Sequence, residues 1–296
     1  MGVPGARGAG GGTDGSGVAP VANALVGNPR DAALLELTLL GPELAFEDER
    51  IVAVAGAEFE LTLDGRAMPM HEGFTVAPGS RLRFGARRSG ARAYLAVAGG
   101  IAVTPALGSR ATHLISAMGG LNGRALAAGD RLPLGVRSRF SRFADTRSPF
   151  VTGTRKSRSD PRLRVLPGPQ VDYFAADALD ILQSDAYVVA HNSDRMGFRL
   201  DGPRLTHARG ADIISDATPL GVLQVPASGQ PILLMADRQT TGGYPKIATV
   251  IAADMAIAGQ LAPADTIRFA VCTPAEAVKA LIAQERTLMA LEAAPS

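Results

Sequence analysis

The sequence predicts a mainly β protein of two β-rich lobes, with a few peripheral helices and one helix at the C-terminal end. Short strand-like runs recur along most of the 296-residue chain, and glycine and proline turns separate them. Few of the stretches between these runs show a helical period, which favours a sandwich or barrel over a parallel α/β sheet. The length favours two lobes over a single core.

Residues 1–17 are dominated by glycine. We expect a disordered tail here, because such a segment buries too little apolar surface to offset its ordering entropy. The run from Gly10 to Gly15, GGGTDG, fits the dinucleotide-binding pattern G-x-G-x-x-G. No strand signal precedes it and no βαβ unit surrounds it, so the match predicts no nucleotide site.

Residues 18–136 form the predicted N-terminal lobe. It begins with a short helix over VAPVANALVGNP, and a strand follows from Leu34. In EFELTLDGR, apolar and polar residues alternate before Asp64 and Gly65, a favoured hairpin turn pair. Two later runs complete this lobe, RAYLAVAGG at 92–100 and GDRLPLG at 129–135.

Residues 137–164 form a predicted connecting segment between the lobes. Nine basic residues face two acidic ones here, and Phe140, Phe143 and Phe150 lie among them. Aromatic and basic residues in alternation are typical of single-stranded nucleic-acid binding. An exposed connection is the favoured interpretation, because one basic stretch in a charge-balanced protein is usually a solvated surface.

Residues 165–296 form the predicted C-terminal lobe. A helical stretch is expected near 175–183, and strand signals return from AYVVAHNSDRMGFRLDGP to DTIRFAV. The lobe ends in a helix, since Thr273 is a good cap, Pro274 suits the first turn and Glu276 completes a capping box. We expect this helix to pack on the outside of the second lobe.

Composition excludes several classes of protein. With 30 basic and 28 acidic residues, the net charge of +2 gives no field that would attract nucleic acid or an anionic membrane. The single cysteine, Cys272, leaves no internal disulfide and fits a reducing compartment. No apolar run is long enough for a membrane helix, and the N-terminus lacks a signal-peptide layout. We therefore expect a cytoplasmic protein.

Common catalytic motifs are missing from the sequence. It contains no Walker-type phosphate loop, no G-x-S-x-G elbow and no H-E-x-x-H. The four histidines are scattered without ligand spacing, so we expect no metal site: His71, His113, His191 and His207. No Met-Lys-Met segment is present, so we expect no covalent biotin on this chain.

Two polar segments are candidates for a functional site. The first, HNSDRMGFR, interrupts strand signals with a turn at Gly197 and offers Ser193, Asp194 and Arg195 as a hydrogen-bonding set. An arginine at such a turn could clamp a carboxylate or phosphate through two parallel bonds. Asp194 and Arg195 could equally brace the turn, and the sequence does not separate these two interpretations.

The second segment, DRQTTGGYPK, precedes the strand-like run IATVI. Asp237 is a candidate acid, base or orienting group, and Lys246 a candidate for stabilising negative charge on an oxygen. The residues between them are candidate ligand contacts: Arg238, Gln239, Thr240, Thr241, Gly242, Gly243 and Tyr244. The two glycines allow close approach of a ligand to the backbone. A hairpin loop with incidental polar residues is the alternative, but turn geometry explains only the glycine pair.

Four motifs resemble, in this order, those of the allophanate hydrolase subunit 2 family, also called the biotin-dependent carboxyltransferase family. They are RAYLAVAGGI…LGSRAT, LPGPQVDYF, NSDRMGFRL…GP and DRQTTGGYPKIATVI, and the resemblance covers residues 17–270. It is strongest to the 5-oxoprolinase branch of the family. The resemblance implies a cyclophilin-like β-barrel and a cyclic amide or urea-like substrate activated with ATP.

The resemblance also implies partner chains. One is a protein of the subunit 1 family, of the type found as the B-subunit of 5-oxoprolinase, with a shared active site at or near the contact. The other is an amidase-type chain, the A-subunit of such complexes. Arg195, Asp237 and Lys246 are then the expected catalytic residues. Family members typically open with a strand before the first helix, and the glycine-rich start replaces it here, which would expose a sheet edge.

The function that the resemblance favours is the opening of 5-oxoproline to glutamate, and two other functions are alternatives to it. One is the carboxyltransferase part of a urea or allophanate pathway enzyme, which is disfavoured because such relatives tend to lack DRQTTGGYP in this form. The other is a regulatory antagonist of a kinase inhibitor, which needs a partner surface and no chemistry.

Overall fold

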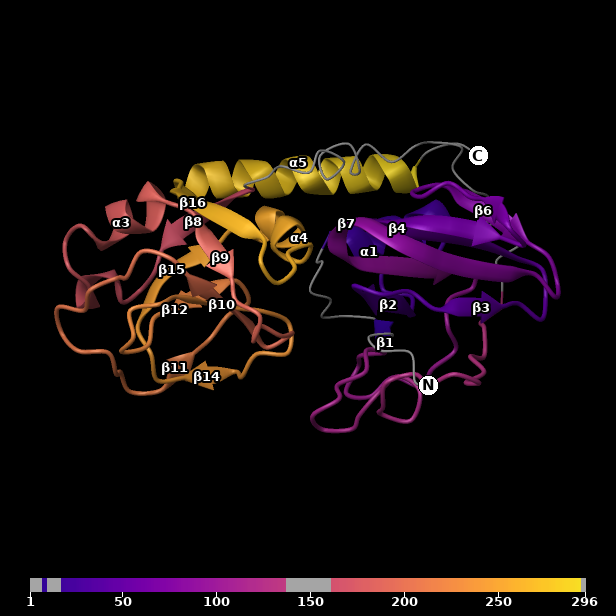
Figure 1. The fold of residues 1–296 in the computed structure, drawn as a ribbon, viewed down its shortest axis with the longest axis horizontal. Coiled ribbons are helices and arrows are strands. Elements are labelled where there is room, and N and C mark those ends of the chain that lie inside the picture. The colour runs from indigo at the N-terminus through magenta and orange to yellow at the C-terminus, as the bar shows by residue number, and fades with distance from the viewer. Residues whose placement is uncertain (1–6, 10–16, 137–160, 294–296) are drawn as a thin grey trace. The chain divides into compact units, whose positions relative to one another are not determined.

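The computed structural model describes residues 7–9, 17–136 and 161–293 (Figure 1). The chain divides into two compact units, residues 1–157 with 284–296 and residues 158–283. The predicted connecting segment lies outside the described residues up to residue 160. Its last residues belong to a strand that begins at Arg162, because Leu163 and Val165 alternate into the core of the second unit.

Unit 1 is built on one antiparallel sheet with the central strand order β1-β2-β7-β4-β5, where β3 also pairs with β7 and β6 with β4. Its strands are β1 (Arg7–Ala9), β2 (Leu34–Thr38), β3 (Glu43–Ala45), β4 (Arg50–Leu63), β5 (Arg66–Ala67), β6 (Gly73–Val76) and β7 (Arg81–Val97). Alternating side chains such as Phe59 and Leu61 pack with Leu37 and Leu95 in its core. The strand pattern predicted from the sequence is confirmed in this unit from Leu34 to Val97.

The predicted disorder of residues 1–17 is wrong at Arg7–Ala9, which pairs antiparallel with β2. Backbone hydrogen bonding along a strand edge needs no apolar side chains, so a glycine- and alanine-rich segment can supply it. The edge that we expected to be exposed therefore carries β1. The other residues of the predicted tail, apart from Gly17, lie outside the described residues.

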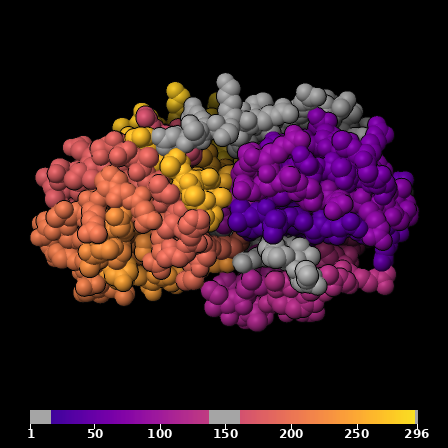
Figure 2. Space-filling model, in the orientation of Figure 1, coloured from indigo at the N-terminus to yellow at the C-terminus, as the bar shows by residue number. Residues whose placement is uncertain are grey.

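Two local predictions in unit 1 are confirmed. Helix α1 (Val18–Leu25) forms where expected and is buried along nearly its whole length. The β4–β5 turn uses Asp64 and Gly65 at φ values of 50° and 83°, and such positive values are typical of a two-residue hairpin turn. The run 129–135 forms only an isolated bridge, between Leu134 and Ile101. It belongs to the long loop after β7, which appears in magenta in Figure 2.

Unit 2 is a closed barrel with the strand order β10-β13-β12-β15-β8-β16-β9, which confirms the expected β-barrel. Its strands are β8 (Arg162–Pro167), β9 (Tyr187–Val189), β10 (Gly197–Asp201), β12 (Val222–Gln224), β13 (Ile232–Leu234), β15 (Lys246–Val250) and β16 (Thr266–Val271). Among the strands that the structure describes, only β8 and β16 pair in parallel. A separate two-stranded ribbon pairs β11 (Asp216–Ala217) with β14 (Thr241–Gly242).

Short helices lie between the strands of unit 2. They are η1 (Val171–Tyr173), α3 (Ala178–Ser184), η2 (Ala252–Asp254) and α4 (Met255–Ala258). The barrel core contains Leu163, Tyr187, Phe198, Ile247 and Phe269, among others. Tyr187 and Phe269 meet edge to face, with their ring centroids 5.7 Å apart.

The C-terminal helix α5 (Pro274–Glu292) begins with the predicted capping box. The Thr273 N–H donates to Glu276 Oε2 at 2.7 Å, and the Glu276 N–H donates to Thr273 Oγ1 at 3.3 Å. The sequence assigns the whole helix to the second lobe, whereas its residues from Gln284 onward belong to unit 1. There Arg30 binds both Glu285 and Glu292. In the described part of the chain, no helix is long and apolar enough to cross a membrane.

Candidate functional site

The two predicted polar segments come together at adjacent strands of the barrel. Residues 193–195 lie in the loop between β9 and β10, and residues 237–245 connect β13 to β15. Strands β10 and β13 are neighbours, with Gly197 opposite Leu234. The loop that enters β10 and the loop that leaves β13 are therefore close, although about forty residues of sequence separate them.

Arg195 and Asp237 form the first charged pair of the site. Arg195 Nε donates to Asp237 Oδ1 at 3.0 Å, and both side chains are nearly buried, at 10% and 13% exposure. The Asp237 N–H also donates to the Arg195 carbonyl oxygen at 3.0 Å. Because the carboxylate already accepts from the guanidinium, its geometry fits an orienting group better than a free base.

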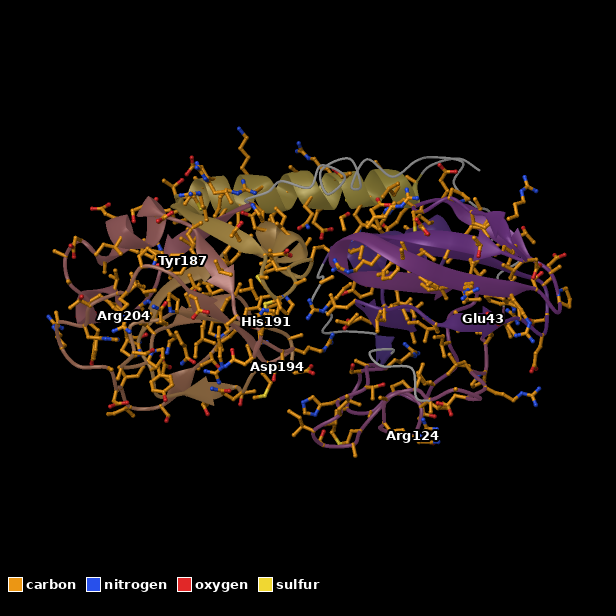
Figure 3. The ribbon with its side chains drawn as sticks, viewed as in Figure 1. Glu43, Arg124, Tyr187, His191, Asp194 and Arg204 are labelled. Carbon is orange, nitrogen blue, oxygen red and sulfur yellow. The ribbon has the colours of Figure 1, made fainter. Side chains whose placement is uncertain are left out.

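Ser193 and Asp194 brace the turn that leads into β10. Asp194 Oδ1 accepts from the backbone N–H groups of Met196 at 2.8 Å and Gly197 at 3.3 Å. Ser193 Oγ accepts from the N–H of Arg199 at 3.0 Å. Figure 3 shows Asp194 near His191 on this loop. These contacts agree with the turn-bracing interpretation of Asp194, whereas the Arg195 side chain pairs with Asp237 of the other polar segment.

Arg238 and its neighbours are held by Thr218, a residue that sequence reasoning missed. Arg238 Nε donates to the Thr218 carbonyl oxygen at 2.7 Å, and burial lowers the pKa of Arg238. The Thr218 hydroxyl donates to the Gln239 carbonyl, and its N–H donates to the Thr240 carbonyl at 3.0 Å. Thr218 is 2% exposed, so a buried residue fixes the backbone of an exposed loop.

The glycine pair and Tyr244 end this loop. Thr241 and Gly242 form β14, and the carbonyl of Gly243 accepts from the Ile213 N–H at 2.8 Å. An added Cβ on Gly242 would lie 2.6 Å from the Gln224 amide nitrogen, so a larger residue here would displace that side chain. The Tyr244 side chain is 39% exposed. Gln239, Thr240 and Thr241 are also exposed, which leaves their side chains open to a ligand.

Lys246 forms the second charged pair of the site. Its side chain is 2% exposed, and its Nζ donates to Asp216 Oδ2 at 2.8 Å. That bond is the main reason why the pKa of Asp216 is lowered, and the Ala217 N–H adds to it. A buried ammonium is stable only beside a counter-charge or acceptors. Asp216 supplies that charge from β11 and was not predicted from the sequence.

The side chains of the two segments include several hydrogen-bond donors, the groups that stabilise negative charge on a carbonyl oxygen. The two segments combine a guanidinium, a buried ammonium and a loop of exposed hydroxyl and amide groups, all of which act as donors. Among the described residues, no group of three or more His, Cys, Asp or Glu side chains is placed to hold a metal ion. His207 bonds to the Val225 carbonyl and stacks on Phe174, while His71 pairs with Glu58 in unit 1.

Comparison with known proteins gives a consistent family assignment. The profile of the carboxyltransferase domain, subdomains A and B, matches residues 8–271. The C-subunit of 5-oxoprolinase from Escherichia coli K12 is 40% identical over 266 residues, which cover 90% of this chain and 84% of that protein. The urea amidolyase of Saccharomyces cerevisiae is 32% identical over 84% of this chain, which corresponds to 14% of that protein. The crystal structure of the K. lactis urea amidolyase superimposes with a TM-score of 0.90 at 29% identity, over 99% of this chain and 20% of that one.

Proposed function

The chain belongs to the carboxyltransferase domain family, and from this membership we propose that it is one subunit of an ATP-dependent 5-oxoprolinase complex. The complex opens 5-oxo-L-proline with water to give L-glutamate. The observation that carries this proposal is the similarity to the C-subunit of a 5-oxoprolinase along most of both chains. The site geometry agrees with it, because its charged donors suit the oxygen of a lactam.

In this proposal the site binds the lactam and polarises its carbonyl. Opening the ring forms a C–O bond from water and breaks the C–N bond, so the carbonyl oxygen carries negative charge in the tetrahedral state. Lys246 and the backbone and hydroxyl donors of Thr240 and Thr241 would stabilise that charge. Arg195 would face the carboxylate of 5-oxoproline, since a guanidinium pairs well with this group. Asp237 would hold the guanidinium in place.

ATP use is proposed for the complex and not for this chain. The described α-helices that begin in unit 2 start at Ala178, Met255 and Pro274, and the two 3-10 helices start at Val171 and Ala252, none of them within the two polar segments. These segments therefore offer no helix N-terminus to a triphosphate, and the sequence has no phosphate loop. We propose that a subunit 1 family protein and an amidase-type protein are the partners that complete the reaction.

The similarity to urea amidolyases supports a second candidate, a carboxyltransferase component of a urea or allophanate pathway enzyme. In that case a carboxyl group would reach the site on biotin attached to another chain. The same donors would then polarise urea in place of the lactam. Assays with both substrates separate the two candidates.

The test is ATP-dependent conversion of 5-oxoproline to glutamate by this chain, alone and after co-purification with its two proposed partners. Asp237→Ala and Lys246→Ala are measured beside Asp185→Ala, which removes an exposed acid that pairs with Arg268 outside both polar segments. We expect turnover only in the complex, and a fall in kcat/KM of about a hundredfold or more for Lys246→Ala. A stable complex without turnover would exclude the 5-oxoprolinase function and favour a regulatory role.

A further inference from the structure

Lys246 is held by residues outside both predicted polar segments. Its side chain is almost fully buried, while the side chain of its partner Asp216 is 51% exposed. The buried ammonium is therefore bonded to a carboxylate that is itself half exposed to solvent. Asp216 lies in β11, opposite Gly242 of β14, so the same ribbon that shapes the glycine pair also places this carboxylate.

The LPGPQ motif, which the proposed function leaves without a role, is built around the backbone of Lys246. Gly168 approaches so closely that an added Cβ would lie 2.2 Å from the Lys246 carbonyl oxygen. The Gly168 N–H donates to the Ile247 carbonyl at 2.7 Å. Two residues later, Gln170 Oε1 accepts from the Lys246 N–H at 3.3 Å. The motif thus fixes where Lys246 enters β15.

Gln170 also affects Asp216. The bond to Lys246 is the main cause of the lowered pKa of Asp216, and the Gln170 side chain is a further, smaller cause. The amide oxygen of Gln170 therefore holds the backbone of Lys246, while Asp216 holds its ammonium. Three segments that are far apart in sequence, around residues 170, 216 and 246, therefore meet at Lys246, one at its ammonium and one at its backbone.

From these contacts we propose that Asp216 and Gln170 are the positioning residues of Lys246: Asp216 fixes its ammonium in the orientation that the reaction uses, and Gln170 fixes the backbone from which the side chain extends. Neither residue needs to touch the substrate. The catalytic consequence rests on the proposed function, whereas the positioning of the amine does not. The two parts can therefore be tested separately.

The first measurement is the reactivity of the Lys246 amine, and the composition makes it simple. The chain has only three lysines, Lys156, Lys246 and Lys279, and Lys279 on α5 is an exposed internal reference. The full chain is labelled with limiting acetic anhydride, and acetylation of each lysine is quantified by mass spectrometry. We expect Asp216→Asn to raise the acetylation rate at Lys246 about tenfold, because the substitution removes a hydrogen bond between charged groups. The rate at Lys279 should stay constant.

Matched variants complete this measurement. Asp216→Glu should restore slow labelling in part, and Gln170→Ala should raise the rate at Lys246 less than Asp216→Asn does. Asp185→Asn also removes an exposed carboxylate from an ion pair, but far from Lys246 in the chain, and should leave the rate unchanged. Circular dichroism verifies folding, and Asp216→Ser serves if the asparagine variant is unstable. Wild-type rates at Lys246 in both Asp216→Asn and Asp216→Ser would overturn the proposal.

The second measurement is turnover by the assembled complex. Asp216→Asn should lower kcat about tenfold with little change in KM, and should alter the pH profile, which a purely structural defect would not do. Unchanged kcat and pH profile would overturn the catalytic part of the proposal. If the wild-type complex has no turnover, the proposed function fails while the labelling result still decides the positioning of Lys246.

Discussion

Arg195 and Asp237 are joined twice, once by their side chains and once by their backbones, each time at 3.0 Å. The pair ties the loop before β10 to the loop after β13. Side chains of opposite charge that are nearly buried depend on each other, because removing one leaves the other charge without its partner. The pair therefore has a structural role besides any role in binding.

Asp237→Ala should destabilise the protein measurably. We expect the free energy of unfolding to fall by about 3 kcal/mol, the cost typical of breaking a buried ion pair from one side. Urea denaturation followed by circular dichroism measures this change. Glu43→Ala is the control, because its ion pair with Arg81 is exposed, at 45% and 67%, and should cost less than about 1 kcal/mol. Equal losses in the two variants would contradict the structural role.

Substitution by alanine should destabilise the protein at one glycine of unit 2 and be tolerated at another. A Cβ on Gly168 would lie 2.2 Å from a backbone oxygen, so we expect Gly168→Ala to cost about 2–3 kcal/mol through overpacking. A Cβ on Gly243 would meet no atom closer than 3.5 Å, so Gly243→Ala should change the free energy of unfolding by less than about 0.5 kcal/mol. Thermal unfolding of the two variants side by side checks this contrast. A tolerated alanine at Gly168 would show that the LPGPQ motif does not pack tightly on Lys246.

Thr218→Val should loosen the DRQTT loop without disturbing the barrel. The valine has the same shape but leaves the Gln239 carbonyl without its hydroxyl donor, which should cost about 1 kcal/mol. Hydrogen exchange of the residue-218 amide, which donates to Thr240, should become faster. Thr75→Val, at an exposed side chain on β6, is the matched control. Unchanged exchange at residue 218 would show that the hydroxyl does not hold the loop.

The Asp216–Lys246 bond predicts a specific dependence on pH. The hydrogen bond that Lys246 donates to Asp216 holds the pKa of this carboxyl group below the usual 3.8. Such a carboxylate contributes stability that is present above pH 3.8 and is lost as the pH falls through the lower folded pKa. We expect the stability advantage of the wild type over Asp216→Asn to be constant near neutral pH and to shrink below pH 3.8. Urea denaturation at a series of pH values measures it, and an advantage that persists at the lowest pH would contradict this assignment.

Much of the fold followed from local patterns. Alternation in EFELTLDGR predicted the end of β4, and the Thr273 capping box predicted the start of α5, because both signals depend on neighbours in sequence. The predictions were wrong where pairing between distant segments decides whether a strand forms. Strand β1 forms because β2 offers an edge, and nothing in its own glycine-rich sequence indicates a strand.

The candidate site was predictable only in part, for the same physical reason. Polar density pointed to Arg195, Asp237 and Lys246, but their partners come from other strands. Asp216 and Thr218 lie in a stretch, SDATP, that resembles an ordinary loop. Their roles arise from the pairing of β11 with β14, which no spacing within one segment encodes. The motif LPGPQ carries a signal that the sequence analysis used only as part of the resemblance, since a glycine between two prolines is typical of a rigid segment with a close backbone approach.

Helix α5 sets a limit on how this protein can be dissected. Its first residues belong to unit 2 and its last to unit 1, so the polypeptide crosses between the units a second time inside a continuous helix. A gene fragment for the barrel that stops at the unit boundary would end in mid-helix, because it would keep the capping box at Thr273 but lose the turns from Gln284 onward. Any shortened version meant to isolate the barrel should therefore retain the whole of α5, or replace its second half with a designed helical end.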